Sequence, residues 1–154
     1  PTVSDPIYDL PRPLTAGNIA AWVEEARCAR EAGEGLLAVL VDAAGRIASY
    51  SCFTVWPERS AAEIAGAYRA DLQSAGVGKI GAARSFGWMF EVLGVRLIGV
   101  TAALDNVRSA GVIEAAGFRP MGERDGVRPD GSVRRSRYWE GTREAWRRRM
   151  QSPR

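Results

Sequence analysis

The stretch Gln73-Ser74-Ala75-Gly76-Val77-Gly78 is the most informative part of this sequence. It follows a segment with an extended pattern, Ala62 to Leu72, and it opens a segment with a helical pattern, Val77 to Leu93. The first N–H groups of a helix have no partner within the helix, and the helix dipole favours negative charge beside them. Gly76 and Gly78 let the backbone approach a phosphate without an intervening Cβ. The stretch therefore predicts an anion site at a strand-to-helix turn.

Three other interpretations of these glycines compete with the anion site. A tight turn that binds nothing is the simplest. A P-loop needs a hydroxyl residue after Gly-Lys to hold magnesium, and Gly78-Lys79-Ile80 has none. A dinucleotide site needs an acid at the end of the next strand, and Val95 to Ala102 ends without one, although Gly76 to Gly81 spells G-x-G-x-x-G. The dinucleotide interpretation is therefore unsupported, and the tight turn stays open beside the phosphate site.

The segments after the glycines continue in a characteristic order. Val95 to Thr101 has the pattern of a buried strand, and a short helix starts within Leu104 to Ser109 and ends at Ala116-Gly117-Phe118. This order resembles the GNAT superfamily of acyl-CoA N-acyltransferases: a strand, a glycine turn, a helix, a second strand, Asn-x-x-Ser, a second helix and Gly-Phe. The family pattern Gln/Arg-x-x-Gly-x-Gly/Ala is matched at Gln73, Gly76 and Gly78. The second signature, an Asn before the next helix with Gly-Phe closing it, is matched at Asn106, Gly117 and Phe118.

Within the superfamily the chain looks most like the ribosomal-protein N-terminal acetyltransferases of the RimJ/RimL type. That group tends to show Asn-x-x-Ser, then Gly-Phe, then a hairpin ending in Tyr and a Thr-Arg-Glu-x-Trp tail. The matching positions are Asn106 to Ser109, Gly117-Phe118, Tyr138 and Thr142 to Trp146. The resemblance covers Ala62 to Trp146, and it is thin in the preceding region, which sets acceptor specificity in this fold.

The resemblance implies a single domain over residues 1–154 with an α+β fold. A GNAT-like mixed, mostly antiparallel sheet carries helices on both faces, in three α/β/α layers. A parallel crossover leads to the strand at Val95, and the strand ending near Leu72 splays from it to hold the pantetheine arm of acetyl-CoA. The implied activity is transfer of an acetyl group from acetyl-CoA to a primary amine, either a protein N-terminus or a small molecule, by direct attack in a ternary complex.

The resemblance also assigns residues to the cofactor. N–H groups from Ser74 to Lys79 cradle the pyrophosphate, and Lys79, the only lysine, adds charge. Gln73 braces the loop or touches a phosphate, and an N–H near Asp71 or Leu72 stabilises the oxyanion. Asn106 contacts the pantetheine or simply caps its helix. The predicted cofactor-binding residues are Asp71, Leu72, Gln73, Ser74, Ala75, Gly76, Val77, Gly78, Lys79 and Asn106.

The absence of histidine narrows the chemistry. Histidine-based triads are excluded, so any general base is Asp, Glu, water or a backbone relay. We expect Glu63 to be the base because it begins the strand that leads into the site; a solvated strand residue is the alternative. Ile113 replaces the tyrosine with which many GNAT enzymes protonate the thiolate. The resemblance offers Ser109 as the substitute, and an ordered water or a merely backbone-bonded hydroxyl stays open.

The lack of a strong general base also indicates which pKa the acceptor amine should have. Freeing an α-amine of pKa about 7.8 at pH 7 costs about 1 kcal/mol, whereas freeing a lysine amine of pKa about 10.4 costs about 4.6 kcal/mol. A chain without a strong base therefore suits an α-amine or another amine of low pKa better than a lysine side chain.

Size and composition set further bounds. A chain of 154 residues with 46% hydrophobic and 25% charged residues is typical of one globular domain. No apolar run approaches the ~20 residues that span a bilayer, and no signal-peptide pattern opens the sequence, so we expect a cytoplasmic protein without membrane contact. Cys28 and Cys52 lack the spacing of a disulfide scaffold or a metal site, so we expect two small core residues and no bound metal.

Charge is concentrated at the C-terminal end. Arg119 to Arg154 holds 11 arginines and 5 acidic residues, which alternate with glycine and tryptophan. We favour a solvated hairpin and helix there over a nucleic-acid surface. Two alternative functions stay open: a non-catalytic acyl-CoA-binding or assembly module, because of the absent tyrosine, and a nucleic-acid-binding domain, because of the arginines. We expect a small-molecule or peptide amine as partner and no nucleic acid, and a homodimer stays open.

The remaining periodicities predict the other elements. The predicted strands are Leu36 to Val41, Arg46 to Val55, Phe118 to Val127 and Val133 to Glu140. The expected helix caps are Thr15, Gly33 and Thr142. One apolar stripe of the helix after the glycines is expected at Val77, Ile80, Ala83, Phe86, Phe90 and Leu93.

Overall fold

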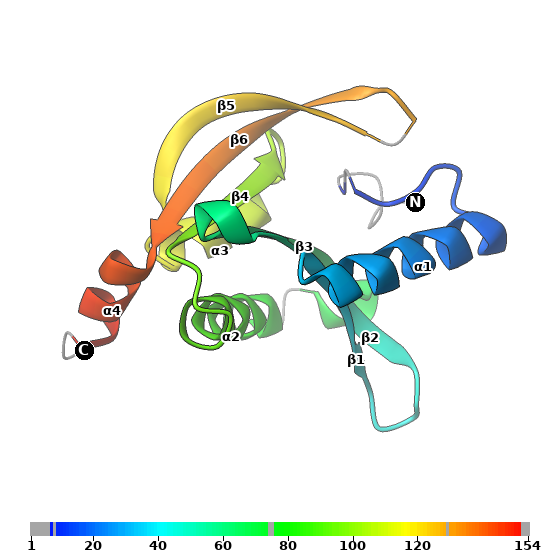
Figure 1. The fold of residues 1–154 in the computed structure, drawn as a ribbon, viewed down its shortest axis with the longest axis horizontal. Coiled ribbons are helices and arrows are strands. Elements are labelled where there is room, and N and C mark those ends of the chain that lie inside the picture. The colour runs from blue at the N-terminus through cyan, green and yellow to red at the C-terminus, as the bar shows by residue number, and fades with distance from the viewer. Residues whose placement is uncertain (1–6, 8, 74–75, 129, 152–154) are drawn as a thin grey trace.

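The computed structural model describes residues 7, 9–73, 76–128 and 130–151. Their helices and strands form one mixed sheet covered by helices (Figure 1). The helices are α1 (Ala16–Ala32), α2 (Val77–Glu91), α3 (Val107–Ala115) and α4 (Arg143–Gln151). The strands are β1 (Gly35–Val41), β2 (Ile47–Trp56), β3 (Ala61–Tyr68), β4 (Leu97–Ala103), β5 (Arg119–Val127) and β6 (Val133–Thr142).

The six-stranded sheet has the order β1-β2-β3-β4-β6-β5. All neighbouring strands are antiparallel except β3 and β4, which are parallel. The parallel ladder runs only from the pair of Ala61 with Leu97 to the pair of Glu63 with Gly99. Beyond Glu63 the strand β3 stays paired with β2 alone, so the sheet opens between β3 and β4. The predicted mixed, mostly antiparallel sheet that splays at its parallel crossover is confirmed.

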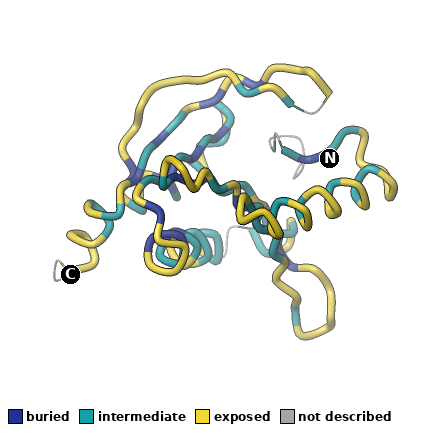
Figure 2. The backbone as a smooth tube through the Cα atoms, in the orientation of Figure 1, coloured by how far each residue is buried: buried dark blue, intermediate teal, exposed yellow. Residues whose placement is uncertain are grey.

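One face of the sheet carries the hydrophobic core. Alternation along β4 and β6 places Ile98, Val100 and Trp139 on this face, where none is more than 3% exposed. The residues of α2 and α3 that pack against them are Phe86, Met89, Phe90, Ala110 and Ile113. Figure 2 shows the buried segments gathered in the sheet and on one side of α2. Apolar burial therefore holds α2 and α3 to one face.

The opposite face is covered by α1. Trp22 of α1 packs edge-on against Tyr50 of β2, with ring centroids 5.7 Å apart. The neighbouring β2 residue Phe53 points to the core face and packs on Trp88 of α2 at 5.1 Å. Helices thus lie on both faces of the sheet, and the predicted three-layer α/β/α architecture is confirmed.

The predicted helix caps are also confirmed. The Thr15 hydroxyl accepts a hydrogen bond from the Asn18 N–H at 3.2 Å at the start of α1. Gly33 ends the same helix with φ at 76°, in the left-handed region. The Thr142 hydroxyl accepts from the Ala145 N–H at 3.2 Å at the start of α4. Local hydrogen bonding therefore sets these three boundaries.

The expected apolar stripe of α2 is only partly correct. Phe86 and Phe90 are buried, but Ile80 is 59% exposed, Ala83 is exposed, and Leu93 lies beyond the helix and is 38% exposed. The first turns of α2 lie after the point where β3 and β4 diverge, so less sheet is available to cover them. Only the second half of the helix packs into the core.

Cys28 is exposed, so its expected place in the core is wrong. It lies on the outer side of α1, one residue before the half-buried Ala29. Cys52 is half-buried on β2, and burial, with the charges of Asp9 and Glu63, raises the pKa of its thiol to about 11. The thiol therefore stays protonated near neutral pH.

Candidate active site

The opening between β3 and β4 begins at the pair of Glu63 with Gly99. At the far end of β3, the Arg69 N–H donates to the Ala48 carbonyl, next to β2, at 2.8 Å. Backbone groups alternate in direction along a strand, so Arg69 and every second residue before it face β2, and the residues between them face the opening. The residues with N–H and C=O groups that face the opening are Ile64, Gly66 and Tyr68. This edge offers main-chain hydrogen bonds to an extended ligand.

The N-terminus of α2 has open space in front of its first turn. Gly76 is the N-cap residue with φ at 75°, and no side chain of the described residues caps the helix. A Cβ placed on Gly76 or Gly78 would have nothing within 4 Å, so the space around the first turn is open. Lys79 lies exposed in the same turn. The turn therefore combines free N–H groups, a positive helix end and room for an anion. Ser74 and Ala75, also predicted here, lie outside the described residues.

Gln73 connects the glycine turn to both sides of the opening. Its Nε2 donates to the carbonyl of Tyr68, the last residue of β3, at 3.0 Å. Its Oε1 accepts a hydrogen bond from Nη1 of Arg108, in the first turn of α3, at 2.7 Å. Bracing of the loop, one of the two roles predicted for Gln73, is thus present in the structure.

Asp71 and Leu72 do not lie on a strand, contrary to the expected strand from Ala62 to Leu72. β3 ends at Tyr68, and the 3-10 turn η2 (Ala70–Leu72) follows it. The Leu72 N–H donates to the Arg69 carbonyl at 2.9 Å. The Arg69 guanidinium donates to the Asp71 carboxylate at 2.7 and 3.0 Å, which lowers the pKa of Asp71. Donors on a strand edge therefore come from β3 itself, at least three residues earlier in the chain.

Asn106 is the N-cap of α3. Its Oδ1 accepts a hydrogen bond from the Ser109 N–H at 3.1 Å, so the predicted cap is present. Ser109 is half-buried in the first turn of the helix. Ile113, at the position of the missing tyrosine, is 6% exposed and belongs to the core. This side of the opening therefore offers a hydroxyl but no phenol.

The two predicted catalytic residues lie at different ends of the opening. Glu63 sits at its closed end, in the last parallel pair. Ser109 follows β4 and lies at the open end, where its neighbour Arg108 bonds to Gln73. The structure thus brings Ser109, Asn106 and the glycine turn together, and it leaves Glu63 on the face that α1 covers.

Sequence reasoning missed two polar residues beside Glu63. Glu63, Gly99 and Glu140 form one row across β3, β4 and β6, and they share a face because they are register partners. Tyr138, two residues before Glu140, donates its hydroxyl proton to Glu140 Oε1 at 2.8 Å. Burial, followed by this hydrogen bond and the charge of Glu140, raises the pKa of Tyr138 to about 12. In the sequence, Tyr138 and Glu140 stand on either side of the apolar Trp139. This alternation of polar and apolar residues could have predicted that the two polar side chains share the face opposite Trp139.

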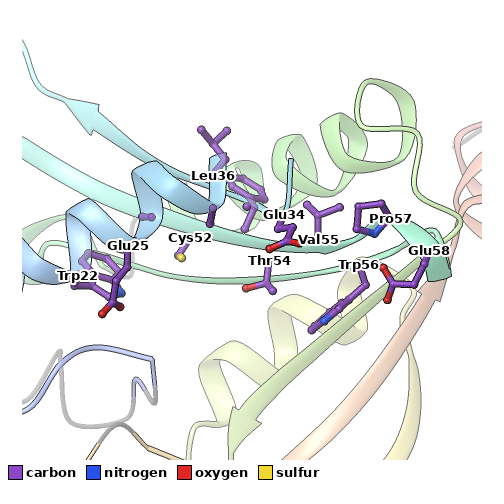
Figure 3. A pocket seen from close by; sticks show the side chains of 14 residues that line it. Trp22, Glu25, Glu34, Leu36, Cys52, Thr54, Val55, Trp56, Pro57 and Glu58 are labelled. Carbon is purple, nitrogen blue, oxygen red and sulfur yellow. The ribbon is translucent and has the colours of Figure 1, made fainter. Parts of the chain in front are cut away.

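A cavity of about 490 Å³ lies between α1 and the ends of β1 and β2 (Figure 3). Trp22 and Glu25 of α1 line it together with Thr54 and Trp56 of β2, and their side chains point to the same side in Figure 3. Thr54 is the register partner of Glu63 on β2. The cavity therefore lies beside the closed end of the opening, on the same face as Glu63.

Three arginines of α4 bond to segments outside that helix. Arg147 of α4 makes two hydrogen bonds to the Glu91 carboxylate of α2, at 3.0 and 3.1 Å. Arg143 Nε donates to the Val95 carbonyl at 2.9 Å, and Arg149 Nη2 donates to the Ala115 carbonyl at 2.7 Å. These contacts attach α4 to the neighbouring loops and helices.

The described part of the chain contains no group of three or more His, Cys, Asp or Glu side chains that could hold a metal ion. It also contains no helix that is both long and apolar enough to cross a bilayer.

Residues 1–119 match a protein-family model described as an acetyltransferase (GNAT) domain. No curated protein matches the chain. The solved ribosomal-protein-S5-alanine acetyltransferase from Vibrio fischeri superposes with a TM-score of 0.77 at 16% identity, covering 93% of this chain and 81% of that one. Mycobacterium smegmatis RimJ in complex with CoA-disulfide gives 0.76 at 16% identity, with 91% and 71% covered. A mutant of the spermidine N-acetyltransferase SpeG from Vibrio cholerae gives 0.72 at 14% identity, with 87% and 80% covered.

Proposed function

This chain belongs to the GNAT acetyltransferase family, and we propose that it transfers an acetyl group from acetyl-CoA to a primary amine by direct attack in a ternary complex. The observation that carries the proposal is the uncapped N-terminus of α2 beside an open strand edge. Coenzyme A joins a diphosphate to an extended pantetheine arm. The open space at Gly76 and Gly78 suits the diphosphate, and the edge of β3 suits the arm.

The residues that would hold the cofactor follow from this placement. The N–H groups of Val77 and Gly78 would bind the diphosphate, and the side chain of Lys79 would add positive charge. The predicted Lys79 N–H instead donates to the Gly76 carbonyl at 3.1 Å. Gln73 would keep the turn next to β3, and Asn106 would keep α3 at the open end. Acetyl-CoA supplies the acetyl group as an activated thioester. The donor for its carbonyl oxygen would be one of the N–H groups of β3 that face the opening.

Glu63 is the proposed general base. It is half-buried on the face that carries the cavity, at the point where the two strands part. A carboxylate there can take a proton from an ammonium nitrogen that approaches from the cavity side. Ser109, at the other end of the opening, is the proposed hydroxyl beside the departing sulfur.

The acceptor is proposed to be a cationic primary amine, either a protein N-terminus or a small molecule. The names of two structural relatives refer to a ribosomal-protein alanine and to spermidine, and both carry such amines. The cavity beside Glu63 is lined by three carboxylates, Glu25, Glu34 and Glu58, and by two tryptophans. Carboxylates and aromatic rings both attract ammonium groups.

Calorimetric titration with acetyl-CoA, followed by release of free thiol over a panel of amines, tests the proposal. We expect binding, and turnover with at least one amine. Glu63→Gln should lower kcat/KM for that amine by about a hundredfold while coenzyme A affinity stays unchanged. Glu123→Gln, on the exposed side of β5, is the matched control and should leave both values unchanged. A chain that does not bind coenzyme A would end the proposal.

One observation favours a second candidate function, a non-catalytic acyl-CoA-binding or assembly module. The position of the usual tyrosine in α3 is filled by Ile113, which is buried in the core. A module would bind acetyl-CoA as well as an enzyme does and would release no thiol with any amine. Thiol release above the uncatalysed rate excludes this candidate.

A further inference from the structure

We propose that Tyr138, held by Glu140, binds the nitrogen of the acceptor amine above Gly99. The inference rests on the proposed function, since it places the nitrogen of that reaction on named atoms. It assigns a positioning role to a hydroxyl on β6, in a chain whose α3 has no tyrosine.

The location is the first reason. Glu63 and Gly99 form the last parallel pair before the sheet opens, and Glu140 is the partner of Gly99 on β6. Tyr138 lies two residues before Glu140, opposite Thr101, and its hydroxyl lies beside Gly99 and Glu140 of this row. Its hydroxyl therefore lies at the closed end of the opening, where Glu63 also points to the face covered by α1.

The fit between Tyr138 and Gly99 is the second reason. A Cβ on Gly99 would lie 3.0 Å from the Tyr138 hydroxyl oxygen and 3.1 Å from a ring carbon. Such distances are shorter than ordinary van der Waals contacts, so an alanine here would push the Tyr138 ring away by a few tenths of an ångström. The guanidinium of Arg124 stacks on the same ring, 4.4 Å from its centroid. The ring is thus held in place by a neighbour below it and by a cation–π contact.

The direction of the hydroxyl proton is the third reason. Tyr138 Oη donates its single proton to Glu140 Oε1 at 2.8 Å, which leaves the lone pairs of Oη as acceptors. The raised pKa keeps this proton on the phenol at neutral pH. An ammonium group has three N–H donors to place. Oη and the carboxylates of Glu140 and Glu63 are three acceptors for them in one part of the sheet.

Charged groups of both signs surround this place. Two carboxylates, Glu63 and Glu140, flank Gly99 in the row, and Glu63 contributes to the raised pKa of Tyr138. Three basic residues also face this place. Arg124 covers the ring, and Arg119 is the register partner of Glu140 on β5. The third is Arg134, whose Nη2 donates to the hydroxyl of Thr101, the register partner of Tyr138, at 3.0 Å. A charged amine can therefore replace part of the water around both carboxylates, whereas a neutral ligand of the same shape cannot.

Binding of n-butylammonium to the full chain, with coenzyme A present, tests the inference. Nuclear magnetic resonance follows the Gly99 amide, and n-butanol serves as the neutral probe. We expect n-butylammonium to shift the Gly99 resonance and n-butanol to leave it unchanged. Tyr138→Phe and Glu140→Gln should each weaken n-butylammonium binding by about tenfold, since each removes a hydrogen bond to a charged group. Glu123→Gln, on the same hairpin, should bind as the wild type does.

Gly99→Ala keeps every hydrogen-bond acceptor of the proposed site and displaces only the ring of Tyr138. It therefore tests whether the position of the hydroxyl matters when the chemical groups are unchanged. It should weaken n-butylammonium binding while coenzyme A affinity stays within about twofold. The inference is overturned if the wild-type Gly99 resonance does not move, or if Tyr138→Phe and Glu140→Gln bind n-butylammonium as tightly as the wild type. Loss of coenzyme A binding in the wild-type chain would instead overturn the proposed function.

Discussion

Arg108 donates a hydrogen bond of 2.7 Å to Oε1 of Gln73, although 35 residues separate the two in sequence. The amide nitrogen of the same Gln73 holds the Tyr68 carbonyl at the end of β3. One side chain thus connects β3, the glycine turn and α3 at the place where the strands β3 and β4 have separated. This connection fixes the distance between the two sides of the proposed cofactor site.

Loss of the connection should weaken cofactor binding without unfolding the protein. We expect Gln73→Ala and Arg108→Ala each to weaken coenzyme A binding by about tenfold in calorimetric titration, because the turn and α3 are then free to move apart. Arg84→Ala, an exposed arginine on α2, is the control for lost positive charge. Equal losses in Arg84→Ala and Arg108→Ala would mean that charge alone matters.

The open space at Gly78 leads to a prediction about the phosphate position. Gly78→Val fills the region in front of the first turn of α2, so coenzyme A affinity should fall by more than about tenfold. The stability of the helix itself should change by less than about 1 kcal/mol, since valine has a slightly better helix propensity than glycine. Gly111→Val in α3, where the added Cβ also meets nothing within 4 Å, is the matched control. Unchanged coenzyme A affinity in Gly78→Val would show that the diphosphate lies elsewhere.

The contact between Gly81 of α2 and Tyr68 of β3 predicts that substitutions at these two positions have non-additive effects on stability. A Cβ at this position would collide with the Tyr68 hydroxyl, so the structure gives a packing reason for a glycine near the start of a helix. Gly81→Ala should gain about 1 kcal/mol from helix propensity and lose about 1–3 kcal/mol to the clash. In a Tyr68→Phe background most of that loss should disappear. Urea unfolding of the four chains of this double-mutant cycle measures the coupling, and additive changes would show that the two side chains do not meet.

Substitution of Ser109 should affect the rate of thiol release more than the affinity for coenzyme A. Ser109→Ala should slow thiol release more than it weakens coenzyme A binding, because the hydroxyl is lost while the N–H that Asn106 accepts is kept. Ser109→Thr keeps a hydroxyl and should recover part of the rate. If Ser109→Ala and the wild type release thiol equally fast, water protonates the sulfur instead.

Much of the fold was predictable because it rests on local interactions. Thr15, Gly33, Asn106 and Thr142 end or begin helices through hydrogen bonds or backbone angles within a few residues. The alternation of apolar and polar residues predicted the β1–β2 and β5–β6 hairpins, since this pattern also lies within neighbouring residues. The glycine turn and its helix were likewise identified from neighbouring residues.

The sequence by itself therefore determined the order of the elements, their caps and the glycine turn that opens α2, since each depends on residues close together in the chain. Only the tertiary structure decided which face of α2 is buried, where β3 separates from β4, and that Tyr138 lies over Gly99 beside Glu140. These relationships depend on strand register and on the rotation of a helix against the sheet. Both are set by packing between distant segments, which no pattern within one segment contains.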